Sequence, residues 1–221
     1  MAVAVDATGH GNNSTGSTTV SCSVTVGSGS NRYMTILVSI RGAQTVSGIT
    51  VDGVAATQVA SARANVTVAS ADRWYIKNPN SGTITVTATL SASAVAAIGV
   101  ISFTGVDQTT PHGTAVAATG ASAAPSVTVT SATGEVVVGG FAQKRNTATT
   151  TTAGTGQTKQ WDEPNVNLTL NAADSTEDGA ASVVMDWSTG TNSDSWAATG
   201  LSIKPAAAAT TIPRLTLLGV G

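Results

Sequence analysis

Apolar and polar residues alternate along much of this sequence, which is the pattern of β-strands that bury one face. In segment 18–26, TTVSCSVTV, every second residue from the third onward is apolar, and the residues between them carry hydroxyl groups. The apolar face consists of Val20, Cys22, Val24 and Val26. Segment 33–42, YMTILVSIRG, is more densely apolar and predicts a strand that is buried on both faces.

Segment 94–105, AVAAIGVISFTG, is the most apolar part of the β-rich region. A buried helix is compatible with this run, but Gly99 and the two β-branched residues that follow it favour a central strand. The strongest turn signal is the Asp52-Gly53 pair in GITVDGVAATQVA. Asp-Gly between two valines is typical of a type I′ hairpin, in which both central residues need a positive φ.

The remaining alternating segments complete an all-β pattern. Further strands are predicted in 48–60, 66–90 (two strands joined by NPNSG), 125–131, 135–145, 181–188 and 195–205. Segment 146–180 is poor in apolar residues, and there we expect extended loops with one short strand. About ten strands without helical periodicity predict an antiparallel β-sandwich of the jelly-roll or lectin-like type. We expect residues 1–205 to form a single domain.

The composition changes after Pro205. Residues 206–221, AAAATTIPRLTLLGVG, form a small-residue linker followed by an apolar run. The apolar side chains of this predicted C-terminal arm are Ile212, Leu215, Leu217, Leu218 and Val220. Because such a segment is unfavourable in water, we expect it to dock on a neighbouring chain or on its own domain, and we favour the neighbour.

The low charge argues against a nucleic-acid partner, and the apolar pattern bears on where the protein is made. Only 10% of the 221 residues are charged, with a net charge of −2, and the basic residues are scattered, so nucleic-acid binding is not expected. No apolar stretch reaches the length of a membrane span, and the start lacks the basic and apolar regions of a signal peptide. We therefore expect the protein to be synthesised in a host cytoplasm. Release within a virus particle is one route by which it could leave the cell.

The single cysteine, Cys22, is interpreted as a buried strand residue.

Polar residues in three segments resemble parts of a catalytic site, a phosphate-binding loop and a calcium-binding loop. None of the three segments has all the residues that its motif requires. Asp107 and His112 in ISFTGVDQTTPHG are one candidate pair, yet no nucleophile motif accompanies them, so they are interpreted as a turn at a sheet corner. GTGQTK, from 154, lacks the glycine before lysine that a phosphate loop requires. DSTEDG, 174–179, does not fit EF-hand spacing and is interpreted as a solvated acidic loop, with another kind of calcium site as the alternative. We expect no enzyme activity, catalytic residue, metal or cofactor.

Trp161 is the tryptophan with the most polar surroundings, in TKQWDEPN. Trp74, Trp187 and Trp196 fall in predicted strands and are assigned to the core. An exposed aromatic ring can stack on a sugar, and Asp162 and Asn165 could bind its hydroxyl groups. Trp161 is therefore a candidate glycan contact, although we favour an aromatic side chain that anchors a loop.

Four motifs in order resemble a module of phage particle proteins and bacterial surface proteins. They are SFTGVDQTTP from Ser102, SVTVTSATGEVVV from Ser126, GTGQT from Gly154 and AASVVMDW from Ala180. The resemblance covers about residues 30–206 and implies a jelly-roll or lectin-like sandwich with an accessory or structural role. It transfers no catalytic residue.

The sequence therefore predicts a structural virion protein, most specifically a capsid decoration protein of a tailed phage. We expect its C-terminal arm to bind other virion subunits, either the major capsid protein or sister copies in a homo-oligomer. The alternative is a carbohydrate- or receptor-binding module of a tail fibre or cell-surface adhesin.

Overall fold

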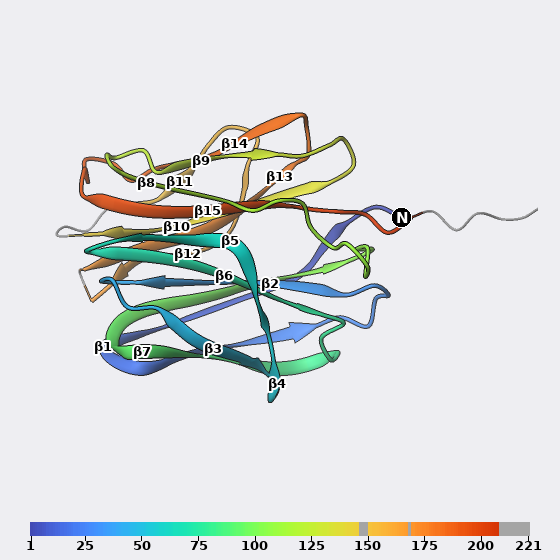
Figure 1. Ribbon diagram of the computed structural model, residues 1–221, viewed down its shortest axis with the longest axis horizontal. Coiled ribbons are helices and arrows are strands. Elements are labelled where there is room, and N and C mark those ends of the chain that lie inside the picture. Colours follow the sequence, from blue (N-terminus) through green and yellow to red (C-terminus); the bar gives the residue numbers. More distant parts are fainter. Residues whose placement is uncertain (146–149, 168, 208–221) are drawn as a thin grey trace, which may run out of the picture.

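The protein is an antiparallel β-sandwich built from three stacked sheets (Figure 1). The computed structural model describes residues 1–145, 150–167 and 169–207, and these residues form fifteen strands and no helix. In Figure 1, β9 and β14 lie at the top, β10 and β15 lie beneath them, and β1, β3 and β7 lie at the bottom. The predicted all-β sandwich class is confirmed, with more strands than the ten expected.

The three sheets differ in size and strand order. The seven-stranded sheet runs β4-β3-β7-β2-β6-β5, with β1 also paired to β7. It contains β1 (Ala4–Val26), β2 (Tyr33–Ile40), β3 (Val46–Val51), β4 (Val54–Ala55), β5 (Thr57–Val66), β6 (Ala69–Lys77) and β7 (Gly82–Thr104). The five-stranded sheet, in the order β12-β13-β10-β15-β8, contains β8 (Val116–Ala121), β10 (Val136–Lys144), β12 (Thr158–Val166), β13 (Leu170–Asp178) and β15 (Ser195–Ile203). The three-stranded sheet, β11-β14-β9, contains β9 (Ser126–Thr130), β11 (Thr152–Ala153) and β14 (Ser182–Ser188).

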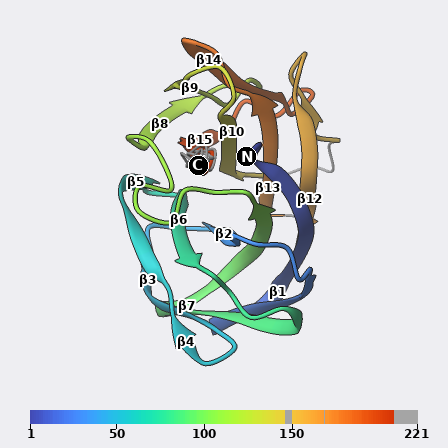
Figure 2. The same ribbon diagram turned by 90° about the vertical axis from the view of Figure 1, so that its right-hand side faces the viewer.

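Strands β1 and β7 form one long antiparallel pair, which runs from Ala4 opposite Thr104 to Val26 opposite Gly82. The first half of β7 also pairs with β3 and the second half with β2, so the seven-stranded sheet curls back over itself (Figure 2). The expectation of separate strands in 66–90 and 94–105 is therefore wrong in one respect. The chain continues through residues 90–94 as a single strand instead of turning.

Three apolar cores fill the spaces between these layers. The barrel core lies inside the curled seven-stranded sheet and includes Val20, Cys22, Val24, Met34, Ile36, Val38, Ile84 and Val86. The central core lies between the seven- and five-stranded sheets and includes Tyr33, Leu37, Ile101, Phe103, Val138, Trp161 and Leu201. The outer core lies beneath the three-stranded sheet and includes Val129, Val137, Phe141, Met185 and Trp187.

Strand β2 separates two of these cores, which explains its dense apolar pattern. Because side chains alternate across a strand, Met34 and Ile36 enter the barrel core while Tyr33 and Leu37 enter the central core. All eight residues of β2 are buried, as the sequence predicted. Cys22 is also a buried strand residue, as expected, and burial raises the pKa of its thiol to about 12.

The Asp52-Gly53 hairpin is confirmed as well. Val51 of β3 pairs with Val54 of β4, and the two turn residues have φ values of 50° and 82°. Positive φ at both central positions is the geometry that a type I′ turn requires.

The expectation of loops across 146–180 is wrong, because β12 and β13 occupy much of that segment. In β13, LNAADST is buried although it is rich in small and polar residues. Its backbone groups are paired on both sides, to β10 and to β12, and its small side chains let the neighbouring layers approach closely. Strand β8 and the polar first half of β1 were also not predicted.

Candidate functional site

The predicted assembly arm has no structural description. Its five apolar residues, Ile212, Leu215, Leu217, Leu218 and Val220, lie outside the described residues. The structure does show where the chain leads into the arm, and the surface at that point is the candidate functional site.

Trp161 is a core residue of β12 and not part of an exposed loop. Its side chain is 4% exposed and belongs to the central core. The indole lies directly on Gly99 of β7, where an added Cβ would be 1.9 Å from Trp161 Cε2. The expectation of a ring free to stack on a sugar is therefore wrong, because pairing of β12 with β13 turns this side chain inward.

The polar neighbours of Trp161 are engaged within the chain. Lys159 Nζ donates to Asp162 Oδ2 at 2.6 Å. Glu163 binds β1 through His10 Nδ1 at 2.8 Å and Asn12 Nδ2 at 3.0 Å. Asn165 lies within β12. These contacts join β1 to the edge of the five-stranded sheet, and a glycan contact at Asp162 or Asn165 stays a prediction.

Asp107 and His112 lie on one corner but have different partners. The Asp107 carboxylate accepts hydrogen bonds from the backbone N–H groups of Thr109 (2.7 Å) and Thr110 (3.1 Å), which lower the pKa of Asp107. His112 Nδ1 lies 2.9 Å from the Gly113 carbonyl oxygen, and its ring packs edge-on against Tyr75. This arrangement agrees with the interpretation of the segment as a turn.

Asp174, expected in a solvated acidic loop, is instead buried in β13. Its carboxylate receives two hydrogen bonds of 3.0 Å from the Arg73 guanidinium of β6, and the two side chains are 1% and 0% exposed. Burial raises the pKa of Asp174, and Arg73 opposes this shift. Over the described parts of the chain, no group of three or more His, Cys, Asp or Glu residues is placed to hold a metal ion.

The two ends of the described chain meet at one end of the molecule, which we call the terminal pole (Figure 1). The N-terminal amine of Met1 donates to the Ala206 carbonyl oxygen at 3.0 Å, and Ala206 N–H donates to the Gly105 carbonyl at 2.8 Å. Gly105 has a φ of 73°, and an added Cβ would lie 2.2 Å from the Ala2 carbonyl oxygen. The arm therefore begins beside the N-terminus.

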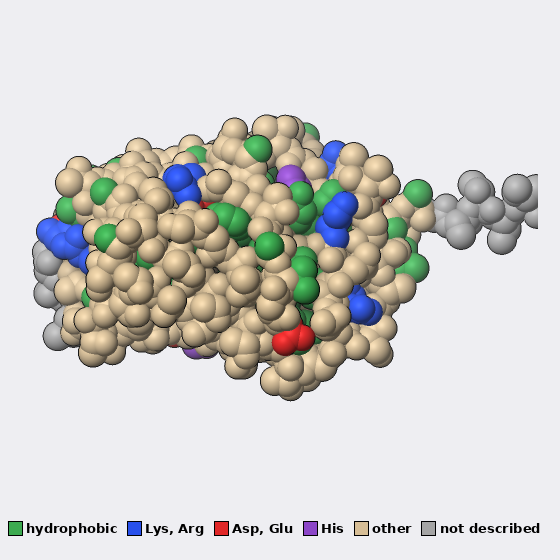
Figure 3. Space-filling model, turned by 60° about the horizontal axis from the view of Figure 1, so that its bottom comes forward, with side chains coloured by type: hydrophobic (Ala, Val, Ile, Leu, Met, Phe, Trp, Pro, Cys, Tyr) green, Lys and Arg blue, Asp and Glu red, His purple; other side chains and the backbone are tan. Residues whose placement is uncertain are grey.

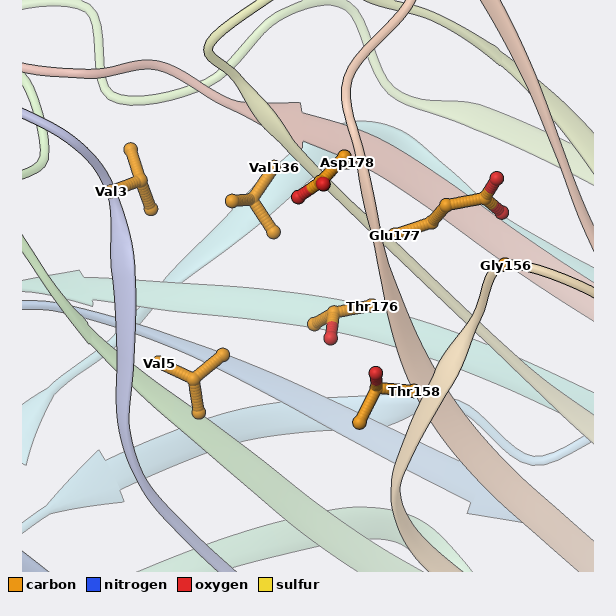
Figure 4. Close-up of a pocket in the computed structure, with 8 residues that line it drawn as sticks. All are labelled: Val3, Val5, Val136, Gly156, Thr158, Thr176, Glu177 and Asp178. Atoms are coloured by element: carbon orange, nitrogen blue, oxygen red, sulfur yellow. The ribbon is translucent and has the colours of Figure 1, made fainter.

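A cavity of about 260 Å³ opens at this pole between β1 and β12 (Figure 4). It is lined by Val3, Val5, Val136, Gly156, Thr158, Thr176, Glu177 and Asp178. An adjoining cavity of about 290 Å³ shares Val3, Val136 and Asp178 and adds Glu135. We call the two cavities together the pole groove. The Asp178 carboxylate at the end of β13 points toward Val136 of β10, whereas the Glu177 carboxylate points away from the valines (Figure 4).

Among the carboxylates that line the groove, Glu177 has the clearest shift in pKa. Partial burial raises its pKa, and the charges of Asp186 and Asp178 add to this shift. No local sequence pattern predicts this groove, because its lining comes from four separated segments.

Substituting Glu177 by glutamine is expected to stabilise the fold slightly at pH 7. A raised pKa in the folded state means that ionisation of Glu177 opposes folding, so the variant gains at a pH above that pKa. The gain should be at most about 0.5 kcal/mol, because the carboxylate is partly exposed and screened. Urea unfolding at pH 7 and pH 3.5 measures it, and the gain should vanish at the lower pH. An equal effect at both pH values would contradict this explanation.

Comparison with known proteins assigns no family: no protein-family model matches the sequence, and no curated protein matches it either. The described residues include no helix that is long and apolar enough to cross a membrane.

Proposed function

We propose that this protein is a structural virion protein, specifically a capsid decoration protein of a tailed phage, that attaches to other virion subunits through its C-terminal arm. The observation that carries the proposal is the place where the described chain leads toward the arm. Ala206 lies at the terminal pole beside Met1, and the apolar run of the arm follows it in the sequence. We assign partner binding to the five apolar residues of the arm from the sequence, because a run of this kind is unfavourable in water.

The surface of the sandwich and the sequence motifs support the same role. The face in Figure 3 is mostly neutral and polar, with isolated lysine and arginine side chains. The described large hydrophobic side chains that are exposed are Met1, Val5, Val54 and Val184. The virion setting itself rests on the resemblance of four motifs to a module of phage particle proteins.

Replacing Ile212, Leu215, Leu217, Leu218 and Val220 by serine in the full-length chain is expected to abolish assembly and leave the sandwich folded. The substitutions remove the apolar surface that binding would bury, and they change no residue among those described in the three cores. Sedimentation velocity measures self-association, co-sedimentation with virus particles measures attachment, and circular dichroism measures folding. As a control, Val54 and Val184, which are exposed elsewhere, are changed to serine and should leave assembly intact. If the five-serine variant assembles like the unmodified chain, the arm is not the attachment segment.

The alternative function, glycan or receptor binding by a tail fibre or adhesin, has less support. Its main contact was Trp161, whose ring is buried in the central core. A glycan array probed with the full chain distinguishes the two functions, since specific glycan binding without assembly would favour the alternative.

A further inference from the structure

The pole groove lies between two strands that are not hydrogen-bonded to each other. Within the described residues, β1 pairs with β7 alone, and β12 is an edge strand that pairs with β13. The two strands are joined by side chains where His10 and Asn12 bind Glu163. Toward the terminal pole they enclose the groove, where Val5 lies opposite Thr158 and Val3 lies opposite Val136 (Figure 4). Two strand edges with an opening between them suit an added extended segment.

The groove combines exposed apolar surface with negative charge. Val5 is 40% exposed and Met1, at the same pole, is 60% exposed. Glu135, Glu177 and Asp178 line the two cavities, and no described lysine or arginine does so. Of these side chains, the Asp178 carboxylate points toward Val136 (Figure 4). A ligand that brings apolar side chains and one positive charge would match this surface.

The C-terminal arm has this chemistry. Residues 206–221 carry one charged side chain, Arg214, among leucine, isoleucine and valine. Its apolar residues match Val3, Val5 and Val136, and its guanidinium matches the carboxylates, with which arginine forms strong charge-assisted hydrogen bonds.

We propose that the pole groove binds the C-terminal arm of a second copy of this chain. The proposal rests on the proposed function and names the acceptor surface for self-assembly. The contact pairs Arg214 of one copy with Asp178 of the other, whose carboxylate points toward Val136 in the groove (Figure 4). Each copy then offers an arm and a groove, so the contact is head-to-tail and generates a ring or a linear array.

The linker before the arm is long enough to reach a second copy. Ala206 already lies at the terminal pole, bonded to Met1. The six residues 206–211 can span about 20 Å when extended, which is more than a chain needs to enter a groove beside its own exit. This reach suits a neighbouring molecule.

Charge reversal on either side of the contact tests the proposal in full-length chains. Arg214→Glu places a negative charge against Asp178, and Asp178→Lys places a positive charge against Arg214. Each variant alone is expected to self-associate about tenfold more weakly, because like charges then meet in the contact. Mixing the two variants should restore association, since one supplies an intact arm and the other an intact groove. Analytical ultracentrifugation of each chain and of the mixture measures this.

A control variant, Thr85→Lys/Thr89→Lys, adds positive charge to exposed positions of β7 and should associate normally. If a single chain carrying both charge reversals regains self-association while the mixture of the two variants does not, the arm occupies its own groove. The second-copy proposal is then overturned. If the groove variant associates normally while the five-serine variant does not, the groove is wrong but the arm still mediates assembly. If the five-serine variant also associates normally, the proposed function fails as well.

Discussion

Substituting Asp174 by alanine is expected to lower the free energy of unfolding by about 3–5 kcal/mol. The Arg73 guanidinium is fully buried between the seven- and five-stranded sheets, and both of its terminal nitrogens donate to Asp174. Without the carboxylate, the positive charge of Arg73 stays buried without its counter-charge. The guanidinium is too far from water to be solvated. Urea unfolding monitored by tryptophan fluorescence measures the loss.

The matched control removes both charges. A chain with Arg73→Met and Asp174→Leu keeps an apolar volume between the sheets and leaves no buried charge, so it should lose much less stability than the single variant. If Asp174→Ala costs less than about 1 kcal/mol, the ion pair is more hydrated than its burial indicates, and the explanation is wrong.

Substituting Gly99 by alanine is expected to cost about 3 kcal/mol, at the upper end for overpacking a core. The added methyl group would lie 1.9 Å from Cε2 and 2.3 Å from Cζ2 of the Trp161 indole. The ring is held in the central core, so either the indole or the facing sheets must move. Thermal and urea unfolding of the variant measure the cost.

Two further variants isolate the cause. Gly48 also lies in a strand, and a Cβ there meets nothing within 4 Å, so Gly48→Ala should be nearly neutral. In a Trp161→Ala background, Gly99→Ala should lose most of its cost because the clash partner is gone. A full penalty in that background would show that the glycine is needed for a reason other than the indole.

The alternation of apolar and polar residues predicted the strands whose buried faces are apolar. It failed for strands whose polar side chains are buried by contacts with distant parts of the chain. Segments 18–26 and 33–42 are strands because valine, isoleucine and leucine mark their buried faces. Strand β13 buries Asn171, Asp174 and Ser175, which a sequence pattern assigns to the surface. Asp174 is tolerated there because Arg73 neutralises it from a strand about one hundred residues away, and no local pattern carries that information.

The candidate site was predictable only in part. The apolar arm is visible in the sequence because its residues are consecutive, whereas the groove lining comes from segments that only the fold brings together. Trp161 was misassigned because its neighbours Asp162 and Glu163 are charged. Their partners, Lys159 and His10, lie at the surface of the same strand or of β1, which leaves the indole alone to face inward.

The pairing of β1 with β7 determines when the protein can complete its fold during translation. Val26 pairs with Gly82 and Ala4 with Thr104, so β1 leaves the ribosome well before its partner β7 has been made. At about 5–20 residues per second, that delay lasts on the order of seconds. The polar run HGNNSTGS within β1, which concealed this strand in the sequence, has few apolar side chains that could join other nascent chains. We therefore expect this half of β1 to contribute little to aggregation before its partner strand emerges.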